Sequence, residues 1–276
     1  MFLNFNGEVR GEGAALLRAD NRGFRYGDGL FETMLVRRGK VRLGEYHFER
    51  LAAGMRLLHL EFPGPFSLDL LEGQIGELCA RNGQGGVVRV RLTVYRSGGG
   101  LYNSPDRHAD YIIQTSEAVA DPGLEVKGLE LDVFPDGRKA CDVFAAIKSN
   151  NYLLSTQAGL FARERGLDDC VVLNAYGRVA ETSIANIWWV REGRLFTPPL
   201  SEGCVAGVMR RWLLEALPGS GYSVGEEPIG PDGLEEAEEI FITNAIRGIQ
   251  WVRDFRGFRF GCRLAAAIRD EIIQKI

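Results

Sequence analysis

Alternating apolar and polar residues mark the strands in the first part of the chain. In residues 86–96, valine and leucine alternate with arginine and threonine, as expected of a strand with one buried face. By such patterns, strands are predicted in residues 2–10, 27–43, 86–96 and 109–119, with a turn at residues 37–40. Apolar residues at helical spacing predict amphipathic helices in His47–Leu60 and in residues 66–83. Residues 1–115 are therefore expected to form a small domain of the α+β class.

A change of pattern at Ser116–Gly123 divides the chain. Polar and turn-forming residues replace the strand pattern there, and we interpret this segment as a linker between two domains. In the second domain, residues 124–276, strands are predicted in residues 124–134, 168–177, 186–198 and 238–246. Helices are predicted in residues 152–166, 205–217 and 263–276. The expected fold is therefore α+β, with two domains or a mixed, barrel-like arrangement.

The composition is that of a globular protein with neither a nucleic acid nor a membrane as partner. The chain has 276 residues, 45% of them hydrophobic, and a formal net charge of −4. Its 33 lysines and arginines are scattered, and no window approaches about 18 consecutive apolar residues. Because the N-terminal residues also lack the pattern of a signal peptide, a cytoplasmic protein is expected.

Neither the cysteines nor the histidines indicate a metal site. The five cysteines are an odd number, lie far apart and lack the paired spacings of a zinc site or a disulfide framework. The three histidines are equally dispersed and match no zinc motif. Reduced thiols and no metal are therefore expected.

The segment VFAAIKSNNYL places a lysine at the end of an apolar run. Val143–Ile147 is predicted to be the buried end of a strand, so Lys148 would lie at a strand terminus. For this lysine taken alone, ordinary solvation past a strand end stays open as the alternative. Three more features accompany it: a lone acid, Glu181, between apolar stretches; Arg50 on the inward side of a helix; and a helix start at Gly207 that can hold a phosphate. These are the parts that a pyridoxal phosphate enzyme needs.

The same segments resemble a known family. IKSNNYL, ETSIANIWWV, DNRGFRYGDGLFET, HFERL and GVMRRWLL follow the order and spacing of the class IV aminotransferases, from Asn4 to about Val252. ETSIAN is similar to the family's E-x-[ST]-x-x-N signature. The resemblance implies fold type IV of the pyridoxal phosphate enzymes, with a small α/β N-terminal domain and a larger C-terminal pseudo-barrel domain that carries the cofactor lysine. The family includes branched-chain aminotransferases, D-amino acid aminotransferases and aminodeoxychorismate lyases.

Carried onto this chain, the resemblance assigns three residues to the cofactor, pyridoxal 5′-phosphate. Lys148 would bind it covalently and move the proton of the substrate's α-carbon, since an amine in an electropositive, partly dry pocket gives up its own proton readily. Glu181 would keep the pyridine nitrogen protonated, so that the ring withdraws electrons. Arg50 would bind the phosphate.

The resemblance also names further phosphate ligands. These are the backbone N–H groups of Val208 and Met209 at the helix start and hydroxyls near Ser183 and Thr243. Family members often have Ile-Thr where this chain has Val208 and Met209, so one hydroxyl is missing, and Asn244 is expected to replace it. For Ser183 and Thr243, the alternative of an ordinary strand hydroxyl stays open.

The expected activity is transfer of an amino group between an amino acid or amine and a 2-keto acid. GVMR and ITNAIRGIQWV look more like aminodeoxychorismate lyases, so a lyase that releases pyruvate and p-aminobenzoate is the alternative. A cofactor-binding protein without turnover is a third possibility. A D-amino acid aminotransferase is disfavoured for two reasons. Phe31 stands where those enzymes have tyrosine, and Arg96 is followed by Ser97 and Gly98, so it does not form their Arg-x-His pair.

The substrate side and the partners follow from the same resemblance. Phe31 would border the substrate, and Arg96 or Arg247 would bind its carboxylate through a bidentate pair, although each also fits an ordinary surface arginine. In relatives, loops of a neighbouring subunit border the active site. A homodimer is therefore expected, with the loop YRSGGGLYNSP crossing to the partner.

Overall fold

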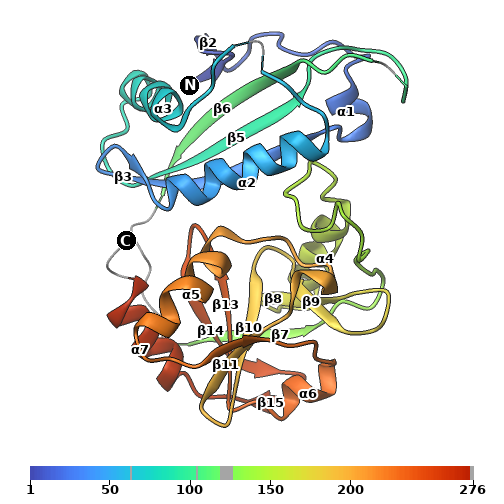
Figure 1. Ribbon diagram of the computed structural model, residues 1–276, viewed down its shortest axis with the longest axis vertical. Coiled ribbons are helices and arrows are strands. Elements are labelled where there is room, and N and C mark those ends of the chain that lie inside the picture. The colour runs from blue at the N-terminus through green and yellow to red at the C-terminus, as the bar shows by residue number, and fades with distance from the viewer. Residues whose placement is uncertain (63, 104, 119–126, 274–276) are drawn as a thin grey trace. The chain divides into compact units, whose positions relative to one another are not determined.

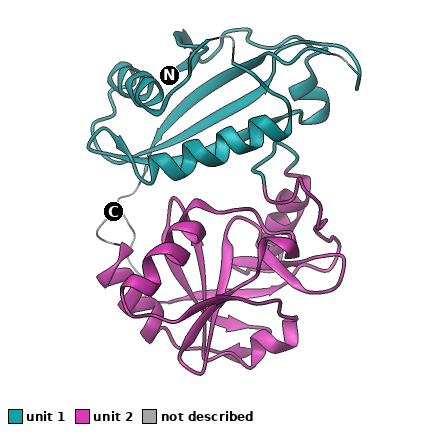
Figure 2. Cartoon of the chain, in the orientation of Figure 1, with its two compact units in different colours: residues 1–120, 147–151 teal, residues 121–146, 152–276 magenta. Residues whose placement is uncertain are grey.

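The computed structural model describes residues 1–62, 64–103, 105–118 and 127–273, and the chain divides into two compact units (Figures 1 and 2). Unit 1 comprises residues 1–120 and 147–151, and unit 2 comprises residues 121–146 and 152–276. The short segment that contains Lys148 therefore packs with unit 1, although the chain on both sides of it belongs to unit 2. Most of the linker expected at Ser116–Gly123 lies outside the described residues, so the domain boundary stays a prediction.

Unit 1 is an antiparallel sheet with two long helices. Its strands are β1 (Phe2–Phe5), β2 (Glu8–Gly11), β3 (Gly29–Arg37), β4 (Lys40–Val41), β5 (Val88–Arg96) and β6 (Ala109–Glu117). They lie in the order β2-β1-β6-β5-β3-β4, and each neighbouring pair is antiparallel. The helices are α1 (Arg22–Tyr26), α2 (Gly44–Leu57) and α3 (Leu68–Arg81). The predicted long helices are confirmed, with α2 beginning at Gly44 instead of His47.

The core of unit 1 follows from the alternation along its strands. Successive side chains of a strand point to opposite faces, so the valines and Leu92 of β5 share one face, which packs against α2 and α3. The helices contribute Leu51, Met55, Leu71, Ile75 and Leu78 to this cluster. Each such side chain stabilises the fold by about 1.5–3 kcal/mol when buried. Arg89 and Arg91 of β5 therefore lie on the opposite face.

Unit 2 is a mixed sheet with helices around it. Its strands are β7 (Leu129–Val133), β8 (Asp169–Leu173), β9 (Val179–Thr182), β10 (Asn186–Arg191), β11 (Arg194–Thr197), β12 (Val224–Glu226), β13 (Glu239–Asn244), β14 (Gly248–Phe255) and β15 (Phe258–Arg259). They lie in the order β12-β11-β10-β13-β14-β7-β8-β9, with β15 beside β14. The pairs β11–β12, β14–β7 and β7–β8 are parallel. The helices are α4 (Leu153–Glu164), α5 (Val208–Gly219), α6 (Pro231–Glu235) and α7 (Arg263–Glu271), with a short 3-10 turn at Leu200–Glu202.

The register between β10 and β13 decides which side chains share a face. Asn186 lies opposite Thr243, and Trp188 lies opposite Phe241, with the two rings stacked 5.8 Å apart. The alternate residues, Ile187 and Trp189 on β10 among them, point into the main core of unit 2. Asn186, Trp188 and Thr243 therefore lie together on the other face of the sheet.

The prediction of a strand at Val143–Ile147 is wrong. Residues 143–146 form a turn, in which the carboxylate of Asp142 accepts the N–H of Phe144 at 2.9 Å. Val143 and Phe144 are 68% and 51% exposed, so the apolar run is not buried. An aspartate that bonds the backbone two residues ahead favours a turn over a strand, and this local preference outweighs the apolar pattern.

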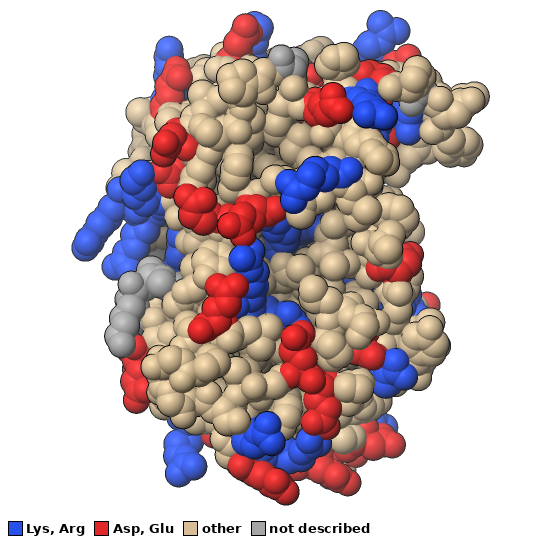
Figure 3. Space-filling view, in the orientation of Figure 1, with Lys and Arg blue, Asp and Glu red and all other residues tan. Residues whose placement is uncertain are grey.

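The surface carries mixed charges, and the cysteines are thiols. Lysine and arginine are interspersed with aspartate and glutamate on the face seen in Figure 3. No helix of the described residues is long and apolar enough to span a bilayer, and the cytoplasmic location stays a prediction. All five cysteines are free thiols, and burial raises the pKa of Cys170 and of Cys204 to about 12. These two thiols are therefore protonated and unreactive at neutral pH.

Candidate active site

Lys148 is held at the edge of the unit 1 sheet by its backbone. The N–H of Phe31 donates to the carbonyl of Lys148 at 2.9 Å, and the N–H of Asn150 donates to the carbonyl of Gly29 at 2.9 Å. Gly29 permits this close approach, because a Cβ there would lie only 2.7 Å from Nδ2 of Asn150. The backbone of Lys148 therefore has a fixed place beside β3, from which its side chain projects.

Two cationic side chains lie over the ring of Phe31. Nζ of Lys148 is 4.3 Å and Cζ of Arg91 is 4.0 Å from the ring centroid. Each cation is attracted to the face of the ring, and Phe31, which is 5% exposed, is itself fixed by packing. The sequence did not predict this position for Arg91. In the alternating pattern of its strand, Arg91 was indistinguishable from an ordinary solvent-facing arginine.

Arg50 belongs to a buried polar cluster with Glu32 and His47, which we call the Glu32 cluster. Nε of Arg50 donates to Oε1 of Glu32 at 2.8 Å, and Nη2 donates to Oε2 at 2.5 Å. Nδ1 of His47 lies 2.7 Å from the same Oε2. Glu32 is 2% exposed and His47 is 1% exposed, so the cluster is shielded from water. Because His47 and Arg50 are three residues apart, they lie on the same face of the helix, and this spacing could have indicated that they share a partner.

The charges of the Glu32 cluster shift two pKa values. Burial alone would raise the pKa of Glu32, but the charges of Arg50 and His47 and their hydrogen bonds outweigh it and lower the pKa to about 2. Burial lowers the pKa of His47, because its effect exceeds the attraction of Glu32 for the imidazolium. His47 is therefore neutral at pH 7, with its Nδ1 proton donated to Glu32. Its Nε2 is buried and has no hydrogen-bond partner among the described residues.

Glu181 lies on β9 with both carboxylate oxygens engaged. Oε1 is 2.5 Å from Nζ of Lys139, and Oε2 accepts the N–H of Val205 at 2.8 Å. Glu181 is 5% exposed, and a charge buried this deeply is tolerated only when such donors surround it. Lys139 lies 42 positions earlier in the chain, and no sequence signal connects it with Glu181.

The helix start predicted at Gly207 is confirmed. Gly207 is the N-cap residue of α5, and in the part of the chain that the structure describes no side chain caps this end of the helix. The N–H groups of Val208 and Met209 are in the first turn, where the helix itself offers them no acceptor. Such a helix start is suited to binding an anion. Asn186 reaches the preceding loop, since its Nδ2 donates to the carbonyl of Val205 at 2.8 Å. This role of Asn186 was not foreseen, although it ends the ETSIAN signature.

Thr243 is buried on the same face of the sheet as Asn186. Its Oγ1 accepts the indole N–H of Trp188 at 3.0 Å. Because an indole nitrogen only donates, the hydroxyl hydrogen of Thr243 remains for a different acceptor. A hydroxyl constrained in this way suits a phosphate oxygen.

Ser183 and Asn244 are occupied by local structure. The N–H of Ser183 donates to Oδ1 of Asp169 at 3.2 Å, and burial raises the pKa of that aspartate despite this hydrogen bond. Oδ1 of Asn244 accepts the N–H groups of Ile246 and Arg247 at 3.0 and 2.8 Å, which closes the turn after β13. The phosphate roles of Ser183 and Asn244 stay predictions.

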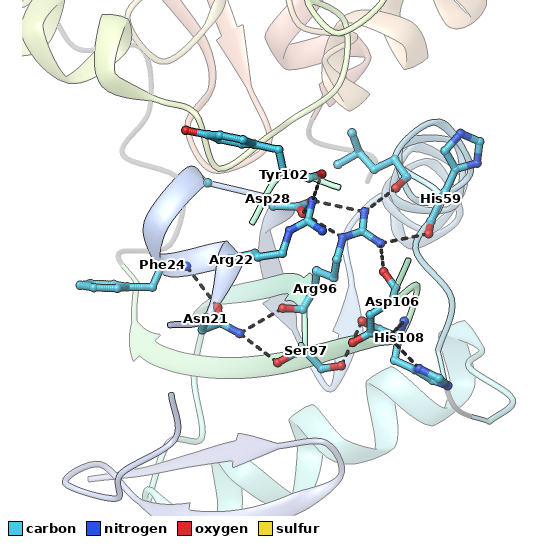
Figure 4. Close-up of polar contacts among 12 residues, drawn as sticks. Asn21, Arg22, Phe24, Asp28, His59, Arg96, Ser97, Tyr102, Asp106 and His108 are labelled. Carbon is cyan, nitrogen blue, oxygen red and sulfur yellow. Dashed lines mark hydrogen bonds and ion pairs between the residues drawn. The ribbon is translucent and has the colours of Figure 1, made fainter. Parts of the chain in front are cut away.

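Arg96 is buried in unit 1, and all five of its donors are used there (Figure 4). Nε donates to Asp28 at 2.8 Å, and the two Nη groups donate to the carbonyls of Leu58 and Asp106 at 2.7 Å each. The two weaker bonds, at 3.3 and 3.4 Å, go to Asp28 and to the carbonyl of His59. Arg96, which is 7% exposed, therefore stabilises unit 1 through these hydrogen bonds. Because its donors are already used, we do not propose it as a ligand of the substrate carboxylate.

The predicted residues thus fall into two groups, each within one unit. Phe31, Arg50 and Lys148 belong to unit 1, where Lys148 and Arg50 both oppose protonation of His47. Glu181 and the start of α5 meet at Val205 in unit 2. Arg247 is exposed and stays a candidate for the substrate. Among the residues that the structure describes, no group of His, Cys, Asp and Glu could hold a metal ion.

Comparison with known proteins identifies one family. A family model described as amino-transferase class IV matches residues 29–255. A putative branched-chain-amino-acid aminotransferase of Methanocaldococcus jannaschii is 29% identical over 93% of this chain and 88% of its own length. The crystal structure of 4-amino-4-deoxychorismate lyase from Pseudomonas aeruginosa is 30% identical, with a TM-score of 0.80 over 98% of this chain and 99% of that one.

A third relative shares the fold at lower identity. It is the crystal structure of a T.th. branched-chain amino acid aminotransferase with pyridoxamine 5′-phosphate, which is 23% identical. Its TM-score is 0.88 over 99% of this chain and 93% of that one. The fold type IV architecture expected from the sequence is therefore confirmed.

Proposed function

This chain belongs to the class IV aminotransferases, and we propose that it moves an amino group between an amino acid or amine and a 2-keto acid with pyridoxal 5′-phosphate as cofactor. The observation that carries the proposal is the family match over residues 29–255, which spans both Lys148 and Glu181. Relatives named as an aminotransferase and as a 4-amino-4-deoxychorismate lyase both cover nearly the whole chain, so both activities are candidates.

The described residues fit this cofactor chemically. An aldehyde carbon needs an amine, and Lys148 offers one from a fixed backbone position. A pyridine nitrogen needs a buried carboxylate, which Glu181 supplies. A phosphate needs donors and positive charge, for which we propose Arg50, Thr243 and the first turn of α5. A relative of the same fold that is named with pyridoxamine 5′-phosphate supports this assignment.

The proposed residues divide the chemistry among them. When bound, pyridoxal 5′-phosphate supplies a ring that withdraws electrons from the substrate's α-carbon. Glu181 holds the proton at the pyridine nitrogen, and the N–H of Val205 and Nζ of Lys139 orient its carboxylate for this task. Nζ of Lys148 accepts the proton of the α-carbon and delivers it again. Arg50 and the N–H groups at the start of α5 bind the phosphate.

A lyase is the second candidate function. The lyase of Pseudomonas aeruginosa, which is 30% identical to this chain, supports it, and so do the GVMR and ITNAIRGIQWV segments. The same proton transfer by Lys148 would begin both reactions. They differ in what leaves: a lyase releases pyruvate and an aromatic amine, whereas an aminotransferase passes the amino group to an acceptor.

The requirement for an acceptor separates these functions. We expect amino acids to yield product in repeated turnovers only when 2-oxoglutarate or pyruvate is present, because the amino group taken from the donor would need a keto acid as its final acceptor. The measurement is product formation by the purified chain with and without the keto acid. Release of p-aminobenzoate and pyruvate from aminodeoxychorismate alone would establish the lyase instead. Bound cofactor whose spectrum no amino donor changes would point to binding without turnover.

We also propose that the chain forms a homodimer. The support is an apolar surface in unit 1 around the loop between β5 and β6, where Leu101 is 63% and Tyr102 is 78% exposed, together with Phe24 at 72%. Light scattering should give twice the mass of the chain. Leu101→Ser with Tyr102→Ser should weaken the dimer, whereas Phe258→Ser, an exposed apolar residue of unit 2, serves as the control. A monomer that keeps full activity on dilution would contradict this proposal.

A further inference from the structure

Asn186 and Gly207 pack against one another at the start of β10 and the start of α5. A Cβ on Gly207 would overlap Oδ1 of Asn186, so the two residues are as close as their atoms allow. Asn186 is 5% exposed, and its backbone is fixed by pairing with Thr243 of β13. Gly207 has φ −62° and ψ 134°, a conformation that alanine adopts without strain. Only the contact with Asn186 therefore excludes a side chain at position 207.

The loop that leads into α5 is fixed through Val205. Its N–H donates to Oε2 of Glu181 and its carbonyl accepts Nδ2 of Asn186, both at 2.8 Å. The same carbonyl accepts the N–H of Gly207 at 2.8 Å, and the N–H of Ala206 donates to the carbonyl of Ala146 at 2.9 Å. The N–H groups of Val205, Ala206 and Gly207 thus each have a defined acceptor, and β9 and β10 together set where the first turn of α5 begins.

We propose that Asn186 is a positioning residue for the phosphate end of the cofactor site. By holding the carbonyl of Val205, it aims the N–H groups of Val208 and Met209, which bind the phosphate under the proposed function on which this inference rests. Asn186 need not touch the cofactor. Glu181 accepts the N–H of the same residue, Val205. The loop at Val205 therefore connects Glu181, proposed to bind the pyridine nitrogen, with the N–H groups proposed to bind the phosphate.

If Asn186 positions the phosphate-binding N–H groups, its loss should weaken only the binding of ligands that carry a phosphate. Asn186→Ala should weaken the binding of pyridoxal 5′-phosphate about tenfold, which corresponds to one buried hydrogen bond. The binding of pyridoxal, which has no phosphate, should not change. Gly207→Ala should act on the same ligand in the same direction, since its Cβ displaces the loop. Gly159→Ala in α4 is the matched control, because a Cβ there meets no atom of a described residue within 4 Å.

The double variant Asn186→Ala/Gly207→Ala tests the contact itself. Without the asparagine side chain, the new Cβ meets no obstacle, so the double variant should bind pyridoxal 5′-phosphate as well as Asn186→Ala alone. Binding to the full chain is measured by quenching of tryptophan fluorescence. Hydrogen exchange in residues 208–211 provides a readout without any ligand, and it should become faster in Asn186→Ala. If that variant does not fold, Asn186→Ser and Gly207→Ala carry the same test.

Two results would overturn the role of Asn186. One is an equal loss of affinity for pyridoxal 5′-phosphate and pyridoxal. The other is a Gly207→Ala effect of the same size with and without the asparagine. In both cases the wild-type chain binds the cofactor normally, so the proposed function stands. A wild-type chain that binds no pyridoxal 5′-phosphate would overturn the proposed function and this inference with it.

Discussion

Replacing Lys148 with alanine should abolish turnover while the chain still binds pyridoxal 5′-phosphate without a covalent bond. Proton transfer by a positioned side chain contributes roughly 10²- to 10⁴-fold to a rate, and Lys148 would also be the covalent anchor, so kcat should fall at least about a thousandfold. The bonds that hold the backbone of Lys148 beside β3 involve no side-chain atom, and the fold should therefore be retained. Activity, visible absorbance and circular dichroism measure the three parts of this expectation.

The covalent bond can be located without any assay of activity. Borohydride reduction of the wild-type chain with bound cofactor should fix a pyridoxyl group on the peptide that contains Lys148, as read by mass spectrometry. Lys40→Ala is the matched control, because the side chain of Lys40 is 77% exposed in the same unit and its loss should change nothing. A label on Lys139, the lysine that contacts Glu181, would show that the cofactor lysine has been misassigned.

Local patterns of apolar and polar residues were enough to predict most of the helices and strands. The alternation in β5 and the helical spacing in α2 and α3 arise from side chains that all face one core, so the periodicity and the structure share a cause. The run Val143–Ile147 is an exception, because its apolar pattern predicted a strand that does not form. Five apolar residues are too few to display a period, and Asp142 gives the backbone a turn that leaves Val143 and Phe144 exposed.

The partners of the candidate site could not be found in this way, because they depend on contacts between distant parts of the chain. Lys139 meets Glu181 across 42 positions, and Glu32 meets Arg50 across 18, with no motif that joins either pair. The burial of Arg96 could not be predicted either. Arg96 ends β5 just before a glycine-rich turn and was expected to be a free cation, yet the structure buries it against Asp28.

Replacing Glu32 with glutamine should destabilise unit 1 strongly. The amide keeps the shape of the side chain but removes the charge that compensates Arg50, whose side chain is 12% exposed. Removing one partner of a buried ion pair typically costs about 3–5 kcal/mol. Glu61→Gln is the matched control, since its ion pair with Arg107 is exposed at both ends and should be worth about 0–1 kcal/mol.

The free energy of unfolding has to be measured for unit 1 itself. All four tryptophans lie in unit 2, so their fluorescence does not report on Glu32 and serves as an internal control. Hydrogen exchange of the amides in β3 and α2 follows the local stability of the Glu32 cluster. Equal exchange in Glu32→Gln and Glu61→Gln would mean that the cluster contributes nothing beyond a surface pair.

Acid should weaken unit 1 in two steps that belong to His47 and Glu32. The folded pKa of His47 lies below its usual 6.5, so the unfolded chain binds a proton first. Its contribution is therefore complete above pH 6.5 and is lost as the pH falls below that value. The folded pKa of Glu32 is about 2 against a usual 4.5, so its contribution is complete above pH 4.5 and is lost as the pH falls towards 2.

The two steps can be separated by variants of the same cluster. The second step is on the order of 3 kcal/mol, since each pKa unit corresponds to about 1.4 kcal/mol. His47→Gln should remove the loss that begins below pH 6.5 and leave the lower step, whereas Glu32→Gln should remove the lower step. If the exchange-derived stability of β3 and α2 in the wild-type chain stayed constant from pH 8 to pH 3, neither residue could have the folded pKa assigned to it. The Glu32 cluster would then hold Arg50 by shape and hydrogen bonds alone.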